Sequence, residues 1–323
     1  MPTVLVTAPY MLPSIERFMP VFKNYGLEII APPVEERMEE EDLLKYAEKF
    51  DGTICGDDRY SRRVLVKCSP RLKVISKWGT GIDSIDREAC LELGIQLKNT
   101  LNAFTLPVAD TVMGYILAFA RRQPWMDRAM KAGEWQKIPG RSLSECTLGV
   151  IGLGNIGKAI IRRACGFGMT ILGNDIQPIA PDFILENKVE MTSFKDLLQR
   201  SDFVTTNTDL NPTSRHLMNK EAFSYMKPTA VMINSSRGPV VDEKALVEAL
   251  QNGRIGGAAM DVFEDEPLPL TSPLLKMDNV MLAPHNSNSS PAAWERVHWN
   301  TIRNLLIGLE ISTADLDEIS KKS

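Results

Sequence analysis

The sequence predicts an α/β protein of two domains, each built around a parallel β-sheet. Its 323 residues exceed what one core usually supports, since single cores stop growing near about 250 to 300 residues. Short β-branched runs alternate with amphipathic segments along most of the chain, which is the pattern of parallel βα units. The glycine-rich stretch GLGNIG, residues 152–157, stands between a predicted strand and a predicted helix, as a dinucleotide-binding turn requires.

The first 76 residues show the alternation clearly. Strands are predicted in VLVTA, LEIIA, GTIC and LKVIS, and helices over about 14–25, 39–49 and 61–68. LKVIS is followed by WGTGIDSID at 78–86, a turn whose small residues let backbone amides approach a ligand or another segment closely. The segment 105–121 is apolar on nearly every face, which predicts a buried helix between domains or subunits.

A second alternating series begins after residue 142. Its predicted strands are TLGVIG, MTILGND, DFVTTN, AVMINSS, GGAAMDVF and NVMLA. Six strands with crossover helices match a doubly wound, Rossmann-type sheet made of two mononucleotide-binding halves. The last helix, 291–310, has Ser290 as its cap and Pro291 at its first position, and we expect it to return to the first domain. The predicted domains are therefore 103–290 and a discontinuous one of 1–102 with 291–323.

Composition excludes several classes of protein. The net charge of -4 gives no basic surface for nucleic acid or an anionic membrane. The five cysteines contain no CxxC pair, so we interpret them as reduced core thiols and expect no metal site. The N-terminus lacks a signal-like pattern, and the longest apolar run, 112–120, is shorter than the roughly 20 residues of a membrane span. A cytoplasmic protein is expected.

The GLGNIG turn carries the prediction of a cofactor. Gly152 allows the tight turn, Gly154 lets a pyrophosphate approach the backbone, and Gly157 lets the helix pack on the strand. The next predicted strand ends at Asp175, where an acid accepts hydrogen bonds from the adenosine ribose and repels a 2′-phosphate. No arginine follows at 176–178, so NAD is favoured over NADP; the alternative is a glycine-rich turn beside a surface aspartate.

Three candidate catalytic residues follow three predicted strands. Arg237 follows AVMINSS, Glu266 follows GGAAMDVF, and His285 follows NVMLAP. Because ligands bind beyond the carboxyl ends of parallel strands, we expect all three side chains at one rim of the sheet. Of the three histidines only His285 stands at a strand end, and imidazole, with an ordinary pKa of about 6.5, suits proton transfer during hydride chemistry.

The stretch DVFEDEP, 261–267, contains four acids, and one of them is predicted to contact His285. We predict that Glu266 is buried against His285 and orients its ring, while Glu264 and Asp265 lie in water. Arg237 offers a planar fork for a substrate carboxylate or for a carbonyl oxygen. The alternatives are a solvated turn for Glu266 and a surface or interdomain ion pair for Arg237.

The set WGTGIDSID, GLGNIG with Asp175, NSSRG, GRIGGAAMDVFEDEP and APH resembles the D-2-hydroxyacid dehydrogenase family, particularly its phosphoglycerate-dehydrogenase-like branch. The resemblance runs from about residue 50 to 300. It implies catalysis by Arg237, Glu266 and His285, a flavodoxin-like substrate domain formed by both chain ends, and a homodimer joined through the cofactor domain. It implies further cofactor contacts at Thr80, Asn155, Ile156, Thr208, Ser235, Ser236 and Asp261. It implies substrate contacts at Gly79, Thr80, Gly81 and Arg237.

Several positions depart from the family pattern. Asn207–Asp209 replace the common His-x-Pro, and Asn286–Ser289 replace small glycines after His285. Gly56, Asp57 and Asp58 replace the basic pair that phosphoglycerate-specific relatives carry after the third strand. Arg59, Arg62 and Arg63 lie just beyond, so a phosphorylated substrate stays open. No C-terminal extension long enough for an amino-acid-binding regulatory domain is present, so feedback control by serine is not expected.

The leading hypothesis is an NAD-dependent oxidoreductase that interconverts a D-2-hydroxy acid and its 2-keto acid. The alternative is an NAD(H)-sensing interaction protein, like the corepressors built on this scaffold, because fold alone does not fix function. Oxidation of formate or phosphite is a weaker alternative, since formate enzymes of the superfamily have an amide in the role of Glu266. Trp78 either lines the substrate pocket or packs in the core.

Overall fold

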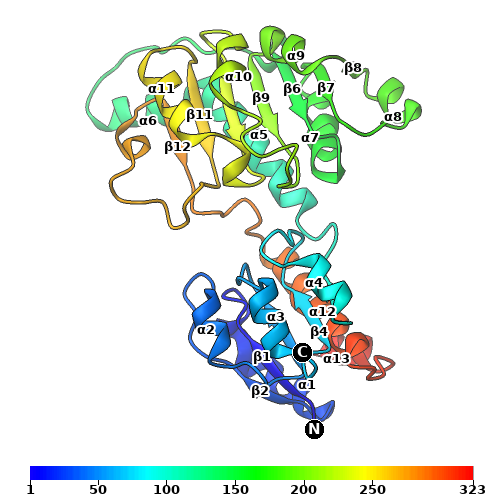
Figure 1. Cartoon of the computed structure of the whole chain (residues 1–323). Helices are drawn as coiled ribbons and strands as arrows, with labels where there is room; N and C mark the ends of the chain where they lie inside the picture. The colour runs from blue at the N-terminus through cyan, green and yellow to red at the C-terminus, as the bar shows by residue number, and fades with distance from the viewer. Residues whose placement is uncertain (323) are drawn as a thin grey trace. The chain divides into compact units, whose positions relative to one another are not determined.

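The computed structural model describes residues 1–322 and shows an α/β chain with two parallel sheets (Figure 1). The chain divides into two compact units, which we call the terminal unit (Met1–Phe104 with Ser290–Ser323) and the central unit (Thr105–Ser289). The two-domain α/β fold class predicted from the sequence is confirmed. Which unit binds substrate stays a prediction.

The terminal unit contains a five-stranded sheet in the order β2-β1-β3-β4-β5, with every pair parallel. Its strands are β1 (Thr3–Val6), β2 (Glu28–Ile30), β3 (Gly52–Cys55), β4 (Val74–Lys77) and β5 (Gln96–Lys98). This is the flavodoxin-like order, in which the chain reverses direction across the sheet between β1 and β3. The strand β5 was not predicted because its three residues, QLK, form no apolar run.

Helices cover both faces of this sheet. They are α1 (Ile15–Asn24, preceded by the short η1, Leu12–Ser14), α2 (Glu40–Leu44), α3 (Arg62–Cys68), α4 (Arg87–Glu92), α12 (Pro291–Gly308) and α13 (Leu316–Lys322). The helix α4 was not predicted, and α2 ends at Leu44, earlier than predicted. The chain then turns, and Glu48 has a left-handed φ of 65°.

The helix α12 returns to the terminal unit as predicted and lies beside β4 (Figure 1). The Ser290 side chain caps it by accepting the Ala293 N–H. The buried Ser76 hydroxyl donates to the Thr301 carbonyl at 2.8 Å. An added Cβ at Gly308 would lie 2.2 Å from Val74 Cγ2, so only glycine permits this close packing of helix on strand.

The central unit contains a seven-stranded parallel sheet in the order β12-β11-β10-β9-β6-β7-β8. Its strands are β6 (Thr147–Ile151), β7 (Thr170–Asn174), β8 (Glu190–Met191), β9 (Phe203–Thr206), β10 (Val231–Asn234), β11 (Gly257–Met260) and β12 (Val280–Leu282). The first six strands in chain order follow the doubly wound order, and β12 extends the sheet beside β11. The prediction of six strands was wrong by one, because β8 has only two residues, both exposed.

The helices of this unit are α5 (Thr105–Arg121), α6 (Gln123–Lys131), α7 (Asn155–Gly166), α8 (Pro181–Glu186), α9 (Phe194–Arg200), α10 (Lys220–Tyr225) and α11 (Glu243–Gln251). Short 3-10 turns are η2 (Leu143–Glu145), η3 (Gly238–Val240) and η4 (Pro273–Lys276). The apolar side of α5 packs inside the unit against α7 and the sheet. Leu106 and Asp110 are exposed, so α5 is not buried on every face.

The remaining composition-based expectations concern cysteines and membrane spans. All five cysteines are free, and four of them are buried, as interpreted from the sequence. Over residues 1–322, no helix combines the length and apolar character needed to cross a membrane.

Candidate active site

The three predicted catalytic residues follow three neighbouring strands of the central sheet. The strands β10, β11 and β12 pair in that order and run parallel, so their carboxyl ends meet at one edge. Arg237 follows β10, Glu266 follows β11 and His285 follows β12. The structure therefore places all three residues at the edge where open α/β sheets bind ligands.

Glu266 and His285 are in direct contact. The Nδ1 atom of His285 lies 2.9 Å from Oε2 of Glu266, and the side chains are 22% and 20% exposed. The other oxygen of Glu266 accepts the Phe263 N–H at 2.9 Å, which fixes the carboxylate within its own loop. A ring that donates its Nδ1 proton to this carboxylate has Nε2 as the atom that exchanges protons with a substrate.

Asp261 holds the backbone that carries His285. His285 has a left-handed φ of 50°, which is uncommon for a residue with a side chain. The Asp261 carbonyl accepts the His285 N–H at 2.7 Å, and its carboxylate accepts the N–H groups of Asn286 (2.8 Å) and Ser287 (3.0 Å). The fully buried Asp261 carboxylate thus positions His285, a role that sequence reasoning missed. The cofactor contact that the resemblance implies for Asp261 stays a prediction.

Glu264 and Asp265, the two remaining acids of DVFEDEP, are exposed, as predicted. Glu264 nevertheless has structural partners: its carboxylate lies 2.8 Å from His216 Nε2 and accepts the Glu243 N–H at 3.3 Å. Glu243 in turn accepts the Glu264 N–H at 3.4 Å, and burial raises the pKa of Glu243. These contacts tie the loop that carries Glu266 to the start of α11.

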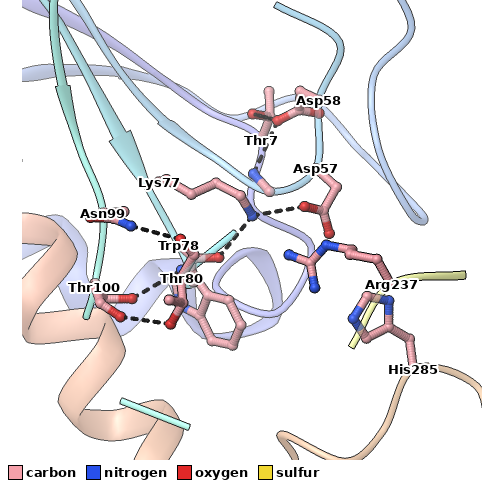
Figure 2. A network of polar contacts seen from close by, with 12 residues as sticks. Thr7, Asp57, Asp58, Lys77, Trp78, Thr80, Asn99, Thr100, Arg237 and His285 are labelled. Atoms are coloured by element: carbon pink, nitrogen blue, oxygen red, sulfur yellow. Dashed lines mark hydrogen bonds and ion pairs between the residues drawn. The ribbon is translucent and has the colours of Figure 1, made fainter. Parts of the chain in front are cut away.

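Arg237 lies between β10 and the η3 turn. Its Nη1 donates to the Ser236 carbonyl at 2.8 Å, and its own carbonyl accepts the Asn234 side-chain amide at 2.9 Å. An added Cβ at the next residue, Gly238, would lie 1.7 Å from the Phe263 carbonyl oxygen. The backbone around Arg237 is therefore packed against the loop of Glu266. Figure 2 draws the side chains of Arg237 and His285.

The glycine turn has the geometry that a dinucleotide needs. Gly152 has a φ of 86°, and a Cβ at Gly157 would lie 2.1 Å from the Gly152 carbonyl oxygen. A Cβ at Gly154 would meet nothing within 4 Å, so the backbone there is open to a ligand. The helix α7 begins at Asn155 and continues through Ile156, and its first-turn N–H groups favour an anion.

Two buried hydroxyls at the ends of β9 and β10 test whether a cofactor fits. Oγ1 of Thr208 and Oγ of Ser235 are buried and have no hydrogen-bond partner among residues 1–322. Ser235 is only 8% exposed, and a buried polar group without a partner is costly unless a ligand satisfies it. These residues fit a polar ligand such as a nicotinamide dinucleotide. The Ser236 hydroxyl, by contrast, already donates to Asn234 Oδ1 at 2.8 Å.

Asp175 follows β7 and is fixed beside the glycine turn. Its two carboxylate oxygens accept the Leu153 N–H at 2.6 Å and the Gln177 N–H at 2.8 Å. These bonds hold a negative charge next to the turn. The structure thus brings Asp175 together with the residues that the sequence assigned to the cofactor.

The GTG turn of the terminal unit presents two backbone amides. Thr100 forms two hydrogen bonds with Gly79. The Gly79 N–H donates to the Thr100 hydroxyl (3.1 Å), and the Thr100 N–H donates to the Gly79 carbonyl (2.9 Å). The Thr80 hydroxyl donates to the Thr100 carbonyl at 3.0 Å (Figure 2). Among residues 1–322, no backbone carbonyl accepts the N–H groups of Thr80 and Gly81. Successive amides of this kind bind anions such as a carboxylate.

Trp78 is buried, which favours a packing role over a role in the substrate pocket. Its Nε1 donates to His298 Nδ1 at 3.0 Å, and its ring lies 5.2 Å from that of Tyr10 and 5.6 Å from that of Phe104. Burial lowers the pKa of His298 to about 4, so this histidine is neutral and accepts the indole N–H.

Comparison with known proteins agrees with this geometry. Residues 113–287 match the family model of the D-isomer specific 2-hydroxyacid dehydrogenase, NAD binding domain. A glyoxylate reductase of Thermofilum pendens is 39% identical over 277 residues, which cover 84% of this chain and 81% of that protein. A D-3-phosphoglycerate dehydrogenase of Methanocaldococcus jannaschii is 40% identical over 78% of this chain, and the chain spans about half (48%) of its length.

A solved structure extends the similarity to nearly the whole chain. The D-lactate dehydrogenase of Aquifex aeolicus, complexed with NAD and lactic acid, superposes with a TM-score of 0.83 at 26% identity. The match covers 99% of this chain and 98% of that one. Together these findings show that the chain belongs to the D-isomer specific 2-hydroxyacid dehydrogenase family, whose members act on a CH–OH group with a nicotinamide cofactor.

Proposed function

We propose that this chain is an NAD-dependent oxidoreductase that interconverts a D-2-hydroxy acid and its 2-keto acid. The observation that carries the proposal is the contact of 2.9 Å between His285 and Glu266 at the edge of a dinucleotide-binding sheet. A histidine oriented by a carboxylate is the proton-transfer unit that hydride transfer to a carbonyl requires.

In the direction of reduction, the hydride for the keto carbon would come from a nicotinamide cofactor held by the GLGNIG turn. Protonated His285 gives the proton on Nε2 to the carbonyl oxygen, which becomes the hydroxyl. Glu266 accepts the Nδ1 proton in a hydrogen bond and stabilises the imidazolium before the transfer. Arg237 binds the substrate carboxylate or the developing negative charge on the oxygen. The substrate contacts that the resemblance implies for Thr80 and Gly81 stay a prediction.

We propose NAD as the cofactor in preference to NADP. The support is Asp175, whose carboxylate is fixed by two backbone amides beside the glycine turn. A ribose with free hydroxyls donates to this acid, whereas a 2′-phosphate meets a like charge. The cofactor contacts proposed for Asn155, Ile156, Thr208, Ser235 and Asp261 belong to the same hypothesis.

The test is NADH oxidation with a panel of 2-keto acids, repeated with NADPH. Similar proteins are named glyoxylate reductase, hydroxypyruvate reductase and D-3-phosphoglycerate dehydrogenase, so the panel contains glyoxylate, hydroxypyruvate and phosphohydroxypyruvate beside pyruvate. We expect turnover of at least one acid with NADH. A folded protein that binds NADH and reduces none of them would favour the NAD(H)-sensing alternative, which pull-down with and without NADH then tests.

A homodimer and a cytoplasmic location complete the proposal. Apolar side chains on and after α6 support self-association of the central unit, since Met130 is half exposed and Trp135 is 87% exposed. Light scattering of the purified chain measures the oligomeric state, and a monomer at micromolar concentration contradicts this part. The free cysteines support a reducing compartment.

A further inference from the structure

The terminal sheet has its own ligand-binding edge. Its strand order reverses between β1 and β3, and open α/β sheets bind ligands beyond the carboxyl ends at such a reversal. The segment Gly56–Asp58 follows β3 directly, and Lys77 is the last residue of the neighbouring β4. Lys77 pairs in register with Cys55, so its side chain and the Gly56–Asp58 segment emerge next to each other.

Lys77 is a buried cation at this edge. Its side chain is only 4% exposed, and its Nζ lies 3.0 Å from Oδ1 of Asp57 and 3.2 Å from the Trp78 carbonyl (Figure 2). An added Cβ at Gly79 would lie 3.5 Å from this Nζ. The ammonium therefore lies against the GTG turn, close in the chain to the backbone amides of Thr80 and Gly81.

The two consecutive aspartates have different tasks. Asp58 is fully buried and accepts the Thr7 hydroxyl (2.6 Å), the Met38 N–H (2.6 Å) and the Gly56 N–H (3.0 Å). It organises the loop, and burial raises its pKa. Asp57 is 40% exposed and lies on the Lys77 ammonium, so it supplies the charge that makes burial of this lysine tolerable.

The three arginines that follow are engaged elsewhere. Arg59 pairs with Glu39 at 3.8 Å, Arg62 with Glu92 at 2.5 Å, and Arg63 with Glu41 at 2.6 Å. Each of these cations is partly exposed and has a carboxylate partner on the surface of the terminal unit. From the sequence these arginines were candidates for binding a phosphate, whereas in the structure each forms an ion pair with a glutamate.

We propose that Asp57 is a specificity-determining residue that makes this edge select 2-keto and 2-hydroxy acids without a phosphate. The inference rests on the proposed function and names its substrate class. With Asp57 in place, the buried cation is neutralised and a phosphate ester meets a carboxylate at the same edge. Without Asp57, the Lys77 ammonium is a buried charge that requires an anion, and a phosphate ester supplies one.

The experiment compares two substrates that differ only by the phosphate, hydroxypyruvate and 3-phosphohydroxypyruvate, in the full chain with NADH. For the wild type we expect kcat/KM to favour hydroxypyruvate by about tenfold or more, since an unfavourable charge contact costs at least this factor. In Asp57→Asn we expect this ratio to move toward the phosphorylated substrate by about tenfold. In the double variant with Lys77→Met the gain disappears, because the cation is gone.

The matched control is Asp42→Asn, which removes a carboxylate from an exposed ion pair with Lys45 in the same unit. We expect it to leave the substrate ratio unchanged. If Asp57 only stabilised the fold, Asp57→Asn would lower kcat/KM for both substrates by the same factor. An unchanged ratio in that variant, or a wild type that uses both acids equally well, overturns the inference while the proposed oxidoreductase stands.

A measurement of binding separates this inference from the proposed function. Inorganic phosphate should raise the melting temperature of Asp57→Asn at millimolar concentration, and should not raise that of the wild type or of the double variant. This result would support the buried anion site even where no keto acid is reduced. Equal shifts for all three proteins would refute it.

Discussion

The contact between Glu266 and His285 allows a quantitative prediction. In Glu266→Gln the side chain keeps its shape and an oxygen for the Phe263 N–H, which Glu266 accepts at 2.9 Å. It loses the charge that faces His285 Nδ1 at 2.9 Å. A hydrogen bond to a charged group contributes about 1.5 to 3 kcal/mol, and this contact strengthens when the ring is protonated. We therefore expect kcat/KM to fall by roughly tenfold to 150-fold.

The assay is steady-state oxidation of NADH by glyoxylate and hydroxypyruvate. The dissociation constant for NADH, measured by fluorescence titration, should stay within about twofold because Glu266 is assigned no cofactor contact. The control is Asp265→Asn, the same acid-to-amide change at the exposed neighbour in the same loop, which should leave kcat/KM unchanged. Wild-type activity in Glu266→Gln, or an equal loss in Asp265→Asn, would refute the orienting role.

Three further variants test the cofactor turn and the buried histidine. Gly157→Ala places a Cβ 2.1 Å from the Gly152 carbonyl oxygen, so it should lower the free energy of unfolding, measured by urea titration, by about 2 kcal/mol and weaken NADH binding. Gly166→Ala, with nothing within 4 Å, should be neutral or stabilising, and equal effects of the two variants would contradict the packing argument. Asp175→Ser should reduce the preference for NADH over NADPH in kcat/KM by about tenfold, and a constant ratio would remove Asp175 from cofactor selection. The pKa of His298 falls from 6.5 to about 4 on burial, so its contribution to stability is complete above pH 6.5 and is lost as pH falls toward 4. Melting temperatures at pH 7 and pH 5 should therefore differ more for the wild type than for His298→Gln, by the equivalent of about 1 to 2 kcal/mol; a parallel decline would exclude the histidine as the cause.

The sequence predicted the parts of the site that lie at the ends of apolar strands. AVMINSS, GGAAMDVF and NVMLA are long enough to be recognised as strands, and parallel strands bring their carboxyl ends together. The contact between Glu266 and His285 follows from that rule. The strands β5 and β8 escaped prediction because each is short and partly exposed, and their residues show no period that distinguishes them from a loop.

Pairings between distant segments could not be read from the sequence. The neutralisation of Lys77 by Asp57 depends on the register of β3 against β4, which no local pattern specifies. The support of His285 by Asp261 depends on a left-handed residue that allows the chain to return to the strand end. A buried acid at the end of a central strand was the available signal for it.

The placement of α12 has a consequence for synthesis of the chain. The helix covers β3 and β4, yet its residues, Pro291–Gly308, leave the ribosome after the whole central unit. Until then Val74 has no packing contact with Gly308, and the Ser76 hydroxyl has no Thr301 carbonyl to donate to. One face of the terminal sheet is therefore not covered by α12 during this time. The central unit, a contiguous stretch, has all its strands earlier. The terminal unit, whose first segment is translated first, therefore lacks part of its core until α12 has been made.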